Sequence, residues 1–154
     1  MKSFVAQALI LASPTAVWDV LTDTGNFAVW NSGITAVSGE LRHGSTIHVR
    51  TQRSGKKTLR FRVTMVMGSS IVWSRQLPLG FGKITRAVTL VAQSGFTNVR
   101  VTETATGFAS VETRSDTNHI LRTFVEAVKF RAELLDHHLS DGVLSISDAP
   151  SRHG

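Results

Sequence analysis

The sequence predicts an α+β fold in which a curved, seven-stranded antiparallel sheet wraps around a long C-terminal helix, with two short helices between strands 1 and 2. From residue 34 to about 107, apolar residues alternate with polar ones and turn residues separate the alternating runs, which is typical of strands. Such short connections favour antiparallel neighbours, because parallel strands need longer crossovers. Over 116–140 the apolar residues return to helical spacing, so one long helix can cover the sheet.

Residues 2–13 predict the first strand. One face carries Phe4, Ala6, Ala8 and Ile10, and the other carries Val5, Leu9 and Leu11. Because both faces are apolar, we expect both to be covered. Lys2 followed by an apolar stretch loosely resembles a secretory signal, but Gln7 interrupts that stretch and the strand is the favoured interpretation.

The segment SPTAVWDVLTDTGNFAVWNSGI, residues 13–34, predicts the two short helices. Ser13 is a suitable N-cap, and Pro14 suits the first helical position, where its missing N–H would have no partner anyway. An inward stripe at positions i, i+3 and i+4 is formed by Val17, Val20 and Leu21. We expect Gly25 to end this helix and a second helical turn to cover residues 27–30.

The remaining elements follow from turn signals and periodicity. Six further strands are predicted at 34–40, 46–53, 57–67, 71–77, 83–92 and 97–106. The long helix is expected to begin at the cap Asp116, and its apolar face carries Leu121, Phe124, Val128, Leu135 and Leu139. The prediction is a single ligand-binding domain over residues 1–142 and a flexible tail over residues 143–154.

Register in the last hairpin predicts an ion pair on the concave face of the sheet. If QSGF, residues 93–96, is a four-residue connection, residue 92 pairs with residue 97 and Arg86 faces Glu103. These are the only charges on an otherwise apolar face, so each needs the other. The pair either satisfies only itself or serves as a polar anchor, with Arg86 orienting an oxygen of a ligand.

The same parity argument predicts a pocket wall between the sheet and the helix. The apolar residues of two neighbouring strands must share a face: Ile47, Val49 and Thr51 with Phe61, Val63 and Met65. This requires a loop with an odd number of residues between the strands, such as residues 54–56. A three-residue turn at 68–70 would likewise place Met65 near Trp73 on the next strand. The expected ligand-binding residues are Phe61, Met65, Trp73, Val88, Val101, Phe124 and Val128, with Trp30 closing one end. The alternative is that this set is ordinary core.

The opening motif resembles the START-like (SRPBCC) superfamily, and in particular its bacterial polyketide cyclase/dehydrase branch. That branch runs Pro-x-x-Val-Trp-x-x-Leu-Thr-Asp, then an aromatic residue, then Trp-Asn. This chain supplies Pro14, Val17, Trp18, Leu21, Thr22, Asp23, Phe27, Trp30 and Asn31. Trp73, Glu103 and Gly107 match later positions. The resemblance implies a helix-grip fold with a deep cavity that binds lipids, sterols, polyketides or other apolar molecules, and some members catalyse cyclisation or dehydration.

Composition excludes several kinds of chemistry. The chain has 154 residues and no cysteine, so disulfides, thiolate metal sites and thiol nucleophiles are excluded. No apolar run approaches the roughly 18 residues of a membrane span. The six histidines are scattered and form no metal set, and we expect no cofactor. No nucleophile or phosphate-binding motif is present.

A basic patch is predicted on the convex face of the sheet. His48 and Arg50 are expected to lie opposite Arg62 and Arg60, where like charges repel. With a formal charge of +6, this face could bind phosphate or another anion, or could be a solvated surface. Nucleic acid is not the expected partner, because no aromatic residue lies among these residues to stack on bases.

Three functions remain open at this level. The favoured one is a cytoplasmic carrier or sensor of a small hydrophobic molecule (a lipid, polyketide or aromatic compound), as a monomer or homodimer. The second is a polyketide cyclase or dehydratase that uses the same pocket, with Glu103 as general acid or base and Arg86 assisting it. The third is a nucleic-acid or partner-binding module that uses the basic convex face.

Overall fold

The computed structural model describes residues 1–30, 32–112 and 116–148, and of residues 111, 112 and 137–148 it describes the backbone only. In chain order the elements are β1 (Lys2–Ile10), α1 (Pro14–Thr22), the 3₁₀ turn η1 (Thr24–Asn26), β2 (Ile34–Ser38), β3 (Thr46–Thr51), β4 (Leu59–Val66), β5 (Ser70–Gln76), the 3₁₀ turn η2 (Pro78–Gly80), β6 (Gly82–Gln93), β7 (Phe96–Gly107), α2 (Phe108–Glu112) and α3 (Thr117–Asp148). The predicted fold class is confirmed.

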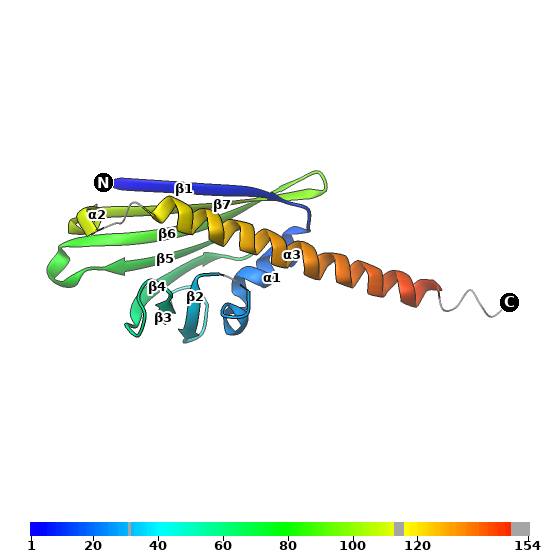
Figure 1. The fold of residues 1–154 in the computed structure, drawn as a ribbon, viewed down its shortest axis with the longest axis horizontal. Coiled ribbons are helices and arrows are strands. Elements are labelled where there is room, and N and C mark those ends of the chain that lie inside the picture. Colours follow the sequence, from blue (N-terminus) through cyan, green and yellow to red (C-terminus); the bar gives the residue numbers. More distant parts are fainter. Residues whose placement is uncertain (31, 113–115, 149–154) are drawn as a thin grey trace.

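All seven strands form one antiparallel sheet in the order β1-β7-β6-β5-β4-β3-β2. The sheet curves, and α3 runs across one of its faces beside β1 and β7 (Figure 1). Helix α3 buries Leu121, Phe124 and Val128 against the sheet, as the helical spacing predicts. Because α3 lies over the β1–β7 side, the concave face of β3 to β6 is less completely covered.

Helix α1 begins as predicted and ends at Thr22, three residues before Gly25, which was expected to end it. The Ala16 N–H donates to Ser13 Oγ at 3.1 Å, so Ser13 is the N-cap. The helix ends at Thr22, and Asn26 then bonds Asp23 through both its backbone N–H and its side-chain amide. These local bonds form a 3₁₀ turn at Thr24–Asn26, earlier than expected, and Gly25 lies inside that turn. Hydrogen-bonded turns continue over residues 27–30, where the second helical turn was predicted.

The outer face of β1 is not covered, which corrects the prediction for this strand. Val5 and Leu9 are 43% and 44% exposed, and Leu11 is more exposed still. The reason is that β1 is an edge strand, and the helix that packs on it covers only the concave side of the sheet.

The C-terminal region also differs from expectation. Helix α3 continues to Asp148, so residues 143–148, which were expected to belong to a tail, are helical, and the rest of that tail lies outside the described residues. Leu135 is exposed instead of buried. The C-terminal part of α3 extends past the end of the sheet (Figure 1). The side chain of Leu139 lies outside the described set. No helix in the described part of the chain combines the length and apolarity needed to cross a bilayer.

Two hairpin registers differ from the prediction by two residues. Thr51 and Ser54 bond each other, so the turn after β3 starts early and the connection to β4 spans residues 52–58. His48 therefore faces Arg60, and Arg62 faces Thr46. A shift of two residues keeps each side chain on its predicted face, since faces alternate with a period of two.

In the next hairpin the same shift separates Met65 from Trp73. Met65 pairs with Ile71, and Trp73 pairs with Val63. The last hairpin has the predicted register: Ala92 pairs with Thr97, and Arg86 with Glu103.

Candidate functional site: a cavity beside the C-terminal helix

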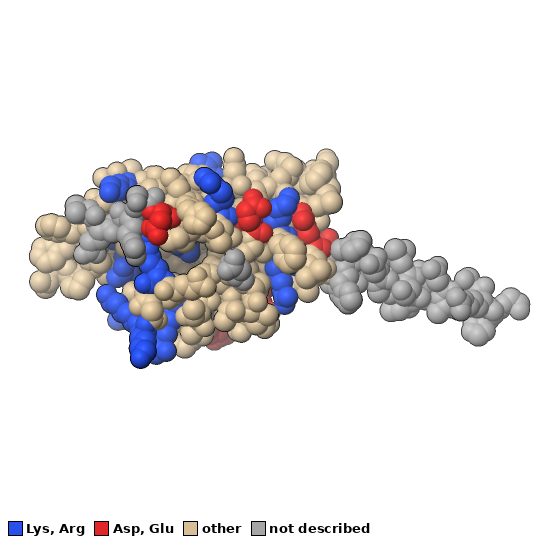
Figure 2. Space-filling model, in the orientation of Figure 1, with Lys and Arg blue, Asp and Glu red and all other residues tan. Residues whose placement is uncertain are grey.

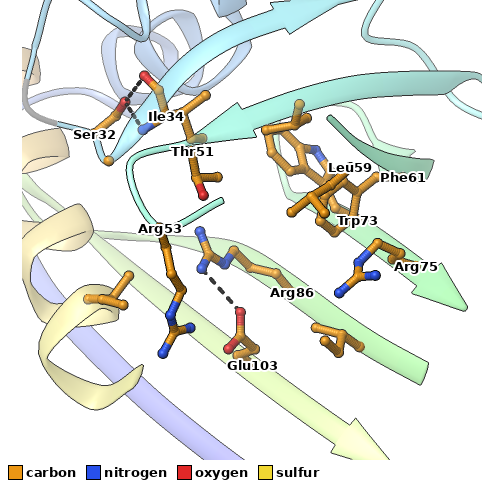
Figure 3. Close-up of a pocket in the computed structure, with 14 residues that line it drawn as sticks. Ser32, Ile34, Thr51, Arg53, Leu59, Phe61, Trp73, Arg75, Arg86 and Glu103 are labelled. Atoms are coloured by element: carbon orange, nitrogen blue, oxygen red, sulfur yellow. Dashed lines mark hydrogen bonds and ion pairs between the residues drawn. The ribbon is translucent and has the colours of Figure 1, made fainter. Parts of the chain in front are cut away.

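A cavity of about 240 Å³ opens on the concave face of the sheet, between β2 to β7, the β3–β4 connection and the first turn of α3 (Figure 3). Its apolar wall is formed by Ile34, Val49, Leu59, Phe61, Trp73 and Ile84. Its charged groups are Arg53, Arg75, Arg86 and Glu103. The cavity therefore combines an apolar wall with a few convergent polar groups, as small-molecule sites do.

Beneath this cavity lies a much smaller one of about 20 Å³, enough for roughly one water molecule. Leu21, Phe27, Val88 and Phe124 contribute to its wall, and Trp73 lines both cavities. The Trp73 ring lies 6.4 Å from that of Phe27 and 5.9 Å from that of Phe61, measured between centroids. Ile34 and Arg86 also line both cavities, so these residues and Trp73 lie between the two spaces.

The predicted ion pair is present on the concave face. Arg86 Nη2 lies 3.1 Å from Glu103 Oε1, and the two side chains are 21% and 11% exposed. Arg86 also lies over the ring of Phe124, with its Cζ atom 5.9 Å from the ring centroid. This aromatic face gives the guanidinium a second favourable electrostatic contact. A role of the pair in binding or catalysis stays a prediction.

The structure divides the predicted ligand-binding residues into two groups. Phe61 and Trp73 line the main cavity, whereas Val88 and Phe124, with Trp73, line the small one. The other four predicted residues line neither of these cavities: Trp30, Met65, Val101 and Val128. Val101 on β7 and Val128 on α3 are fully buried, and these two elements are in contact.

Trp30 is a core residue and does not close the mouth of either cavity. It packs edge-on against Phe27 at 5.4 Å between ring centroids and lies 6.0 Å from Phe124. The second tryptophan of the opening motif, Trp18, is buried on α1. Both indoles are therefore part of the core, and Trp30 joins the segment after η1 to Phe124 of α3.

Sequence reasoning missed two arginines of the cavity. Arg53 comes from the β3–β4 connection and bonds Asp116 and Thr117 at the start of α3. No local pattern indicates that a loop arginine turns inward. Arg75 is different, because it follows Trp73 at i+2 on β5 and faces Ile84 on β6. Strand parity could therefore have placed it on the concave face.

Ser32, just before β2, also lines the cavity without having been predicted. Its hydroxyl donates to the Phe27 carbonyl at 2.6 Å and accepts from the Ile34 N–H at 3.1 Å. Because its hydroxyl bonds backbone groups on both sides of it in the chain, Ser32 holds the start of β2 in place. In the described part of the chain, no group of three His, Asp or Glu side chains could hold a metal ion.

A sheet that curves around a C-terminal helix and leaves a cavity on its concave side is the helix-grip arrangement of START-like proteins. Residues 1–135 match the family described as "Polyketide cyclase / dehydrase and lipid transport", and the chain belongs to that family. The resemblance indicated by the opening motif is therefore confirmed. A comparison with curated proteins finds no match.

Solved structures share this fold at low sequence identity. A protein from Mesorhizobium loti has a TM-score of 0.71 at 14% identity, covering 88% of this chain and 99% of that one. The di-domain ARO/CYC protein BexL of the BE-7585A biosynthetic pathway has a TM-score of 0.67 at 16% identity, covering 88% of this chain and 47% of that one. A START superfamily protein from Mycobacterium smegmatis has a TM-score of 0.64 at 14% identity, covering 89% of this chain and 98% of that one.

Proposed function

We propose that the protein binds a small hydrophobic molecule in the main cavity and acts as its carrier or sensor. The supporting observation is the cavity of about 240 Å³, whose wall is mainly apolar and which is sheltered by the curved sheet and the start of α3. Sites for small molecules span roughly 300–1,000 Å³, so this cavity suits a compact ligand of one or two rings or a short chain.

A cavity-filling substitution tests this proposal. Ile84→Trp places a larger side chain in the cavity wall, and we expect the affinity for the neutral probe 2-naphthylmethanol to fall about tenfold or more. Isothermal titration calorimetry measures the affinity, and native mass spectrometry after mild purification shows whether a co-purified adduct is lost as well. The control is Val91→Trp, on the exposed outer face of the same strand.

Val91→Trp is expected to bind the probe like the unmodified protein. Circular dichroism spectra of both variants establish that the fold is retained. Equal affinity in Ile84→Trp and Val91→Trp would show that the probe binds elsewhere and would remove the cavity as the binding site.

A second candidate is a cyclase or dehydratase that acts in the same cavity. The observation that favours it is the Glu103 carboxylate, which lines the cavity and is held by Arg86. A fixed carboxylate can take up or deliver a proton while the walls fold a flexible substrate. For Glu103→Gln we expect turnover of a polyketone test substrate to be lost while its affinity is kept. Unchanged turnover would exclude Glu103 as the acid or base.

A further inference from the structure

Two buried hydrogen-bond donors in the cavity wall have no partner among the residues that the structure describes. They are Trp73 Nε1 and Arg75 Nε, two residues apart on β5. Trp73 lines both cavities, and Arg75 lines the main one. Buried polar groups in proteins are almost always hydrogen-bonded, so two unsatisfied donors in one cavity wall favour a hydrogen-bond acceptor at this wall. Neither atom is exposed to solvent in this structure, so a ligand atom reaches them only when the neighbouring side chains shift.

The arrangement of charges indicates that the acceptor is anionic. Of the three arginines that line the cavity, Arg53 pairs with Asp116 and Arg86 pairs with Glu103. Among the described residues Arg75 forms no ion pair, and its guanidinium is directed into the same space as that of Arg86 (Figure 3). The cavity therefore keeps one unneutralised positive charge beside apolar side chains, where electrostatic attraction is stronger than in water.

The surroundings of Arg75 extend this positive region to the other side of the sheet. Leu59 and Arg75 line the cavity and also an outer groove of about 600 Å³, where Arg60, Arg62 and Lys83 contribute positive charge. Lysine and arginine side chains gather at the end of the molecule where β3 and β4 lie (Figure 2). A field of one sign raises the local concentration of anions at this end of the molecule.

From these observations, and resting on the proposed function, we infer that the ligand is an amphipathic acid. Its apolar body lies against Phe61 and Trp73, and an ionised oxygen group, a carboxylate or an enolate, accepts hydrogen bonds from Arg75 Nε and Trp73 Nε1. An ionised acceptor suits Arg75 because hydrogen bonds between charged groups are about twice as strong as those between neutral ones. Arg86 is already held by Glu103, so Arg75 is the anion-binding residue.

Two matched probes test this inference by isothermal titration calorimetry. 2-Naphthoate and 2-naphthylmethanol share the same ring system and differ in the ionised carboxylate. We expect naphthoate to bind about tenfold more tightly. Arg75→Met removes the charge and the donor while keeping an unbranched side chain, and it should abolish this preference without changing the affinity for the alcohol. Trp73→Phe, which keeps an aromatic ring and removes the N–H, should reduce the preference in part.

The control is Arg100→Met, the same substitution on the exposed outer face of β7, at a residue that lines neither the cavities nor the outer groove; it should leave both affinities unchanged. Equal affinity of the two probes, or a preference for naphthoate that survives Arg75→Met, would overturn the acid-binding inference and leave the proposed function intact. If neither probe binds the unmodified protein, the proposed function fails, and this inference fails with it.

Discussion

Glu103→Leu is expected to lower the free energy of unfolding by about 3 kcal/mol, because it leaves the Arg86 guanidinium unpaired inside a mainly apolar cavity. The removed side chain is only 11% exposed, so water cannot replace the lost partner at low cost. Arg86→Met should have an effect of similar size, since it strands the carboxylate instead. Urea denaturation monitored by circular dichroism measures both values.

The double variant Arg86→Met/Glu103→Leu distinguishes a mispaired charge from lost packing. Replacing both members of a buried pair with apolar residues is often nearly neutral, so the double variant should be more stable than either single variant. If instead the two losses add, the single effects come from packing against neighbours such as Phe124, and the charges are not energetically coupled.

Gly107→Ala is expected to destabilise the protein by about 3 kcal/mol, through conformational strain and a steric clash. Gly107 has φ = +61°, and an added Cβ would lie 2.6 Å from the Phe81 carbonyl oxygen and 3.0 Å from Gly82 Cα. These neighbours are backbone atoms where β6 begins and β7 ends, so they cannot rotate away as a side chain could. Thermal and urea denaturation report the loss.

Gly55 provides a matched control for this substitution. Its φ is +60°, nearly the same as at Gly107, but nothing lies within 4 Å of an added Cβ. Gly55→Ala should therefore cost only about 1 kcal/mol, from the positive φ alone. If both variants lose the same stability, the close approach of β6 and β7 at Gly107 contributes nothing.

Local patterns predicted the element order because strands and helices leave different periods in the sequence. The stripe of Val17, Val20 and Leu21 is buried on α1 as expected, and the predicted strand centres all lie within observed strands. Element ends were less predictable. The early turn after Thr51 depends on its side-chain bonds with Ser54, and the short helix α2 carried no recognised periodic signal.

Within the candidate site, the position of a residue could be predicted when a short loop joins it to its neighbour in space, and could not when the two are far apart in the sequence. The pair Arg86–Glu103 could be predicted because a short hairpin loop sets which residues face each other. Arg75 had a usable signal, its parity with Trp73, that the prediction did not apply. Arg53 had none, since its place beside α3 depends on residues more than sixty positions away. The position of Trp30 likewise depends on a distant contact, with Phe124 of α3, which local patterns in the sequence do not specify.

By itself, the sequence determined the seven strands, the long terminal helix and the side of the sheet on which each side chain lies, because these depend on spacing between near neighbours. Only the tertiary structure decided where α3 lies across the sheet. That placement fills the space around Val101 and Val128 and leaves it open around Phe61, Trp73 and Arg75. A cavity is a difference between the volume that two packed elements enclose and the volume that their side chains occupy, and local spacing does not specify that difference.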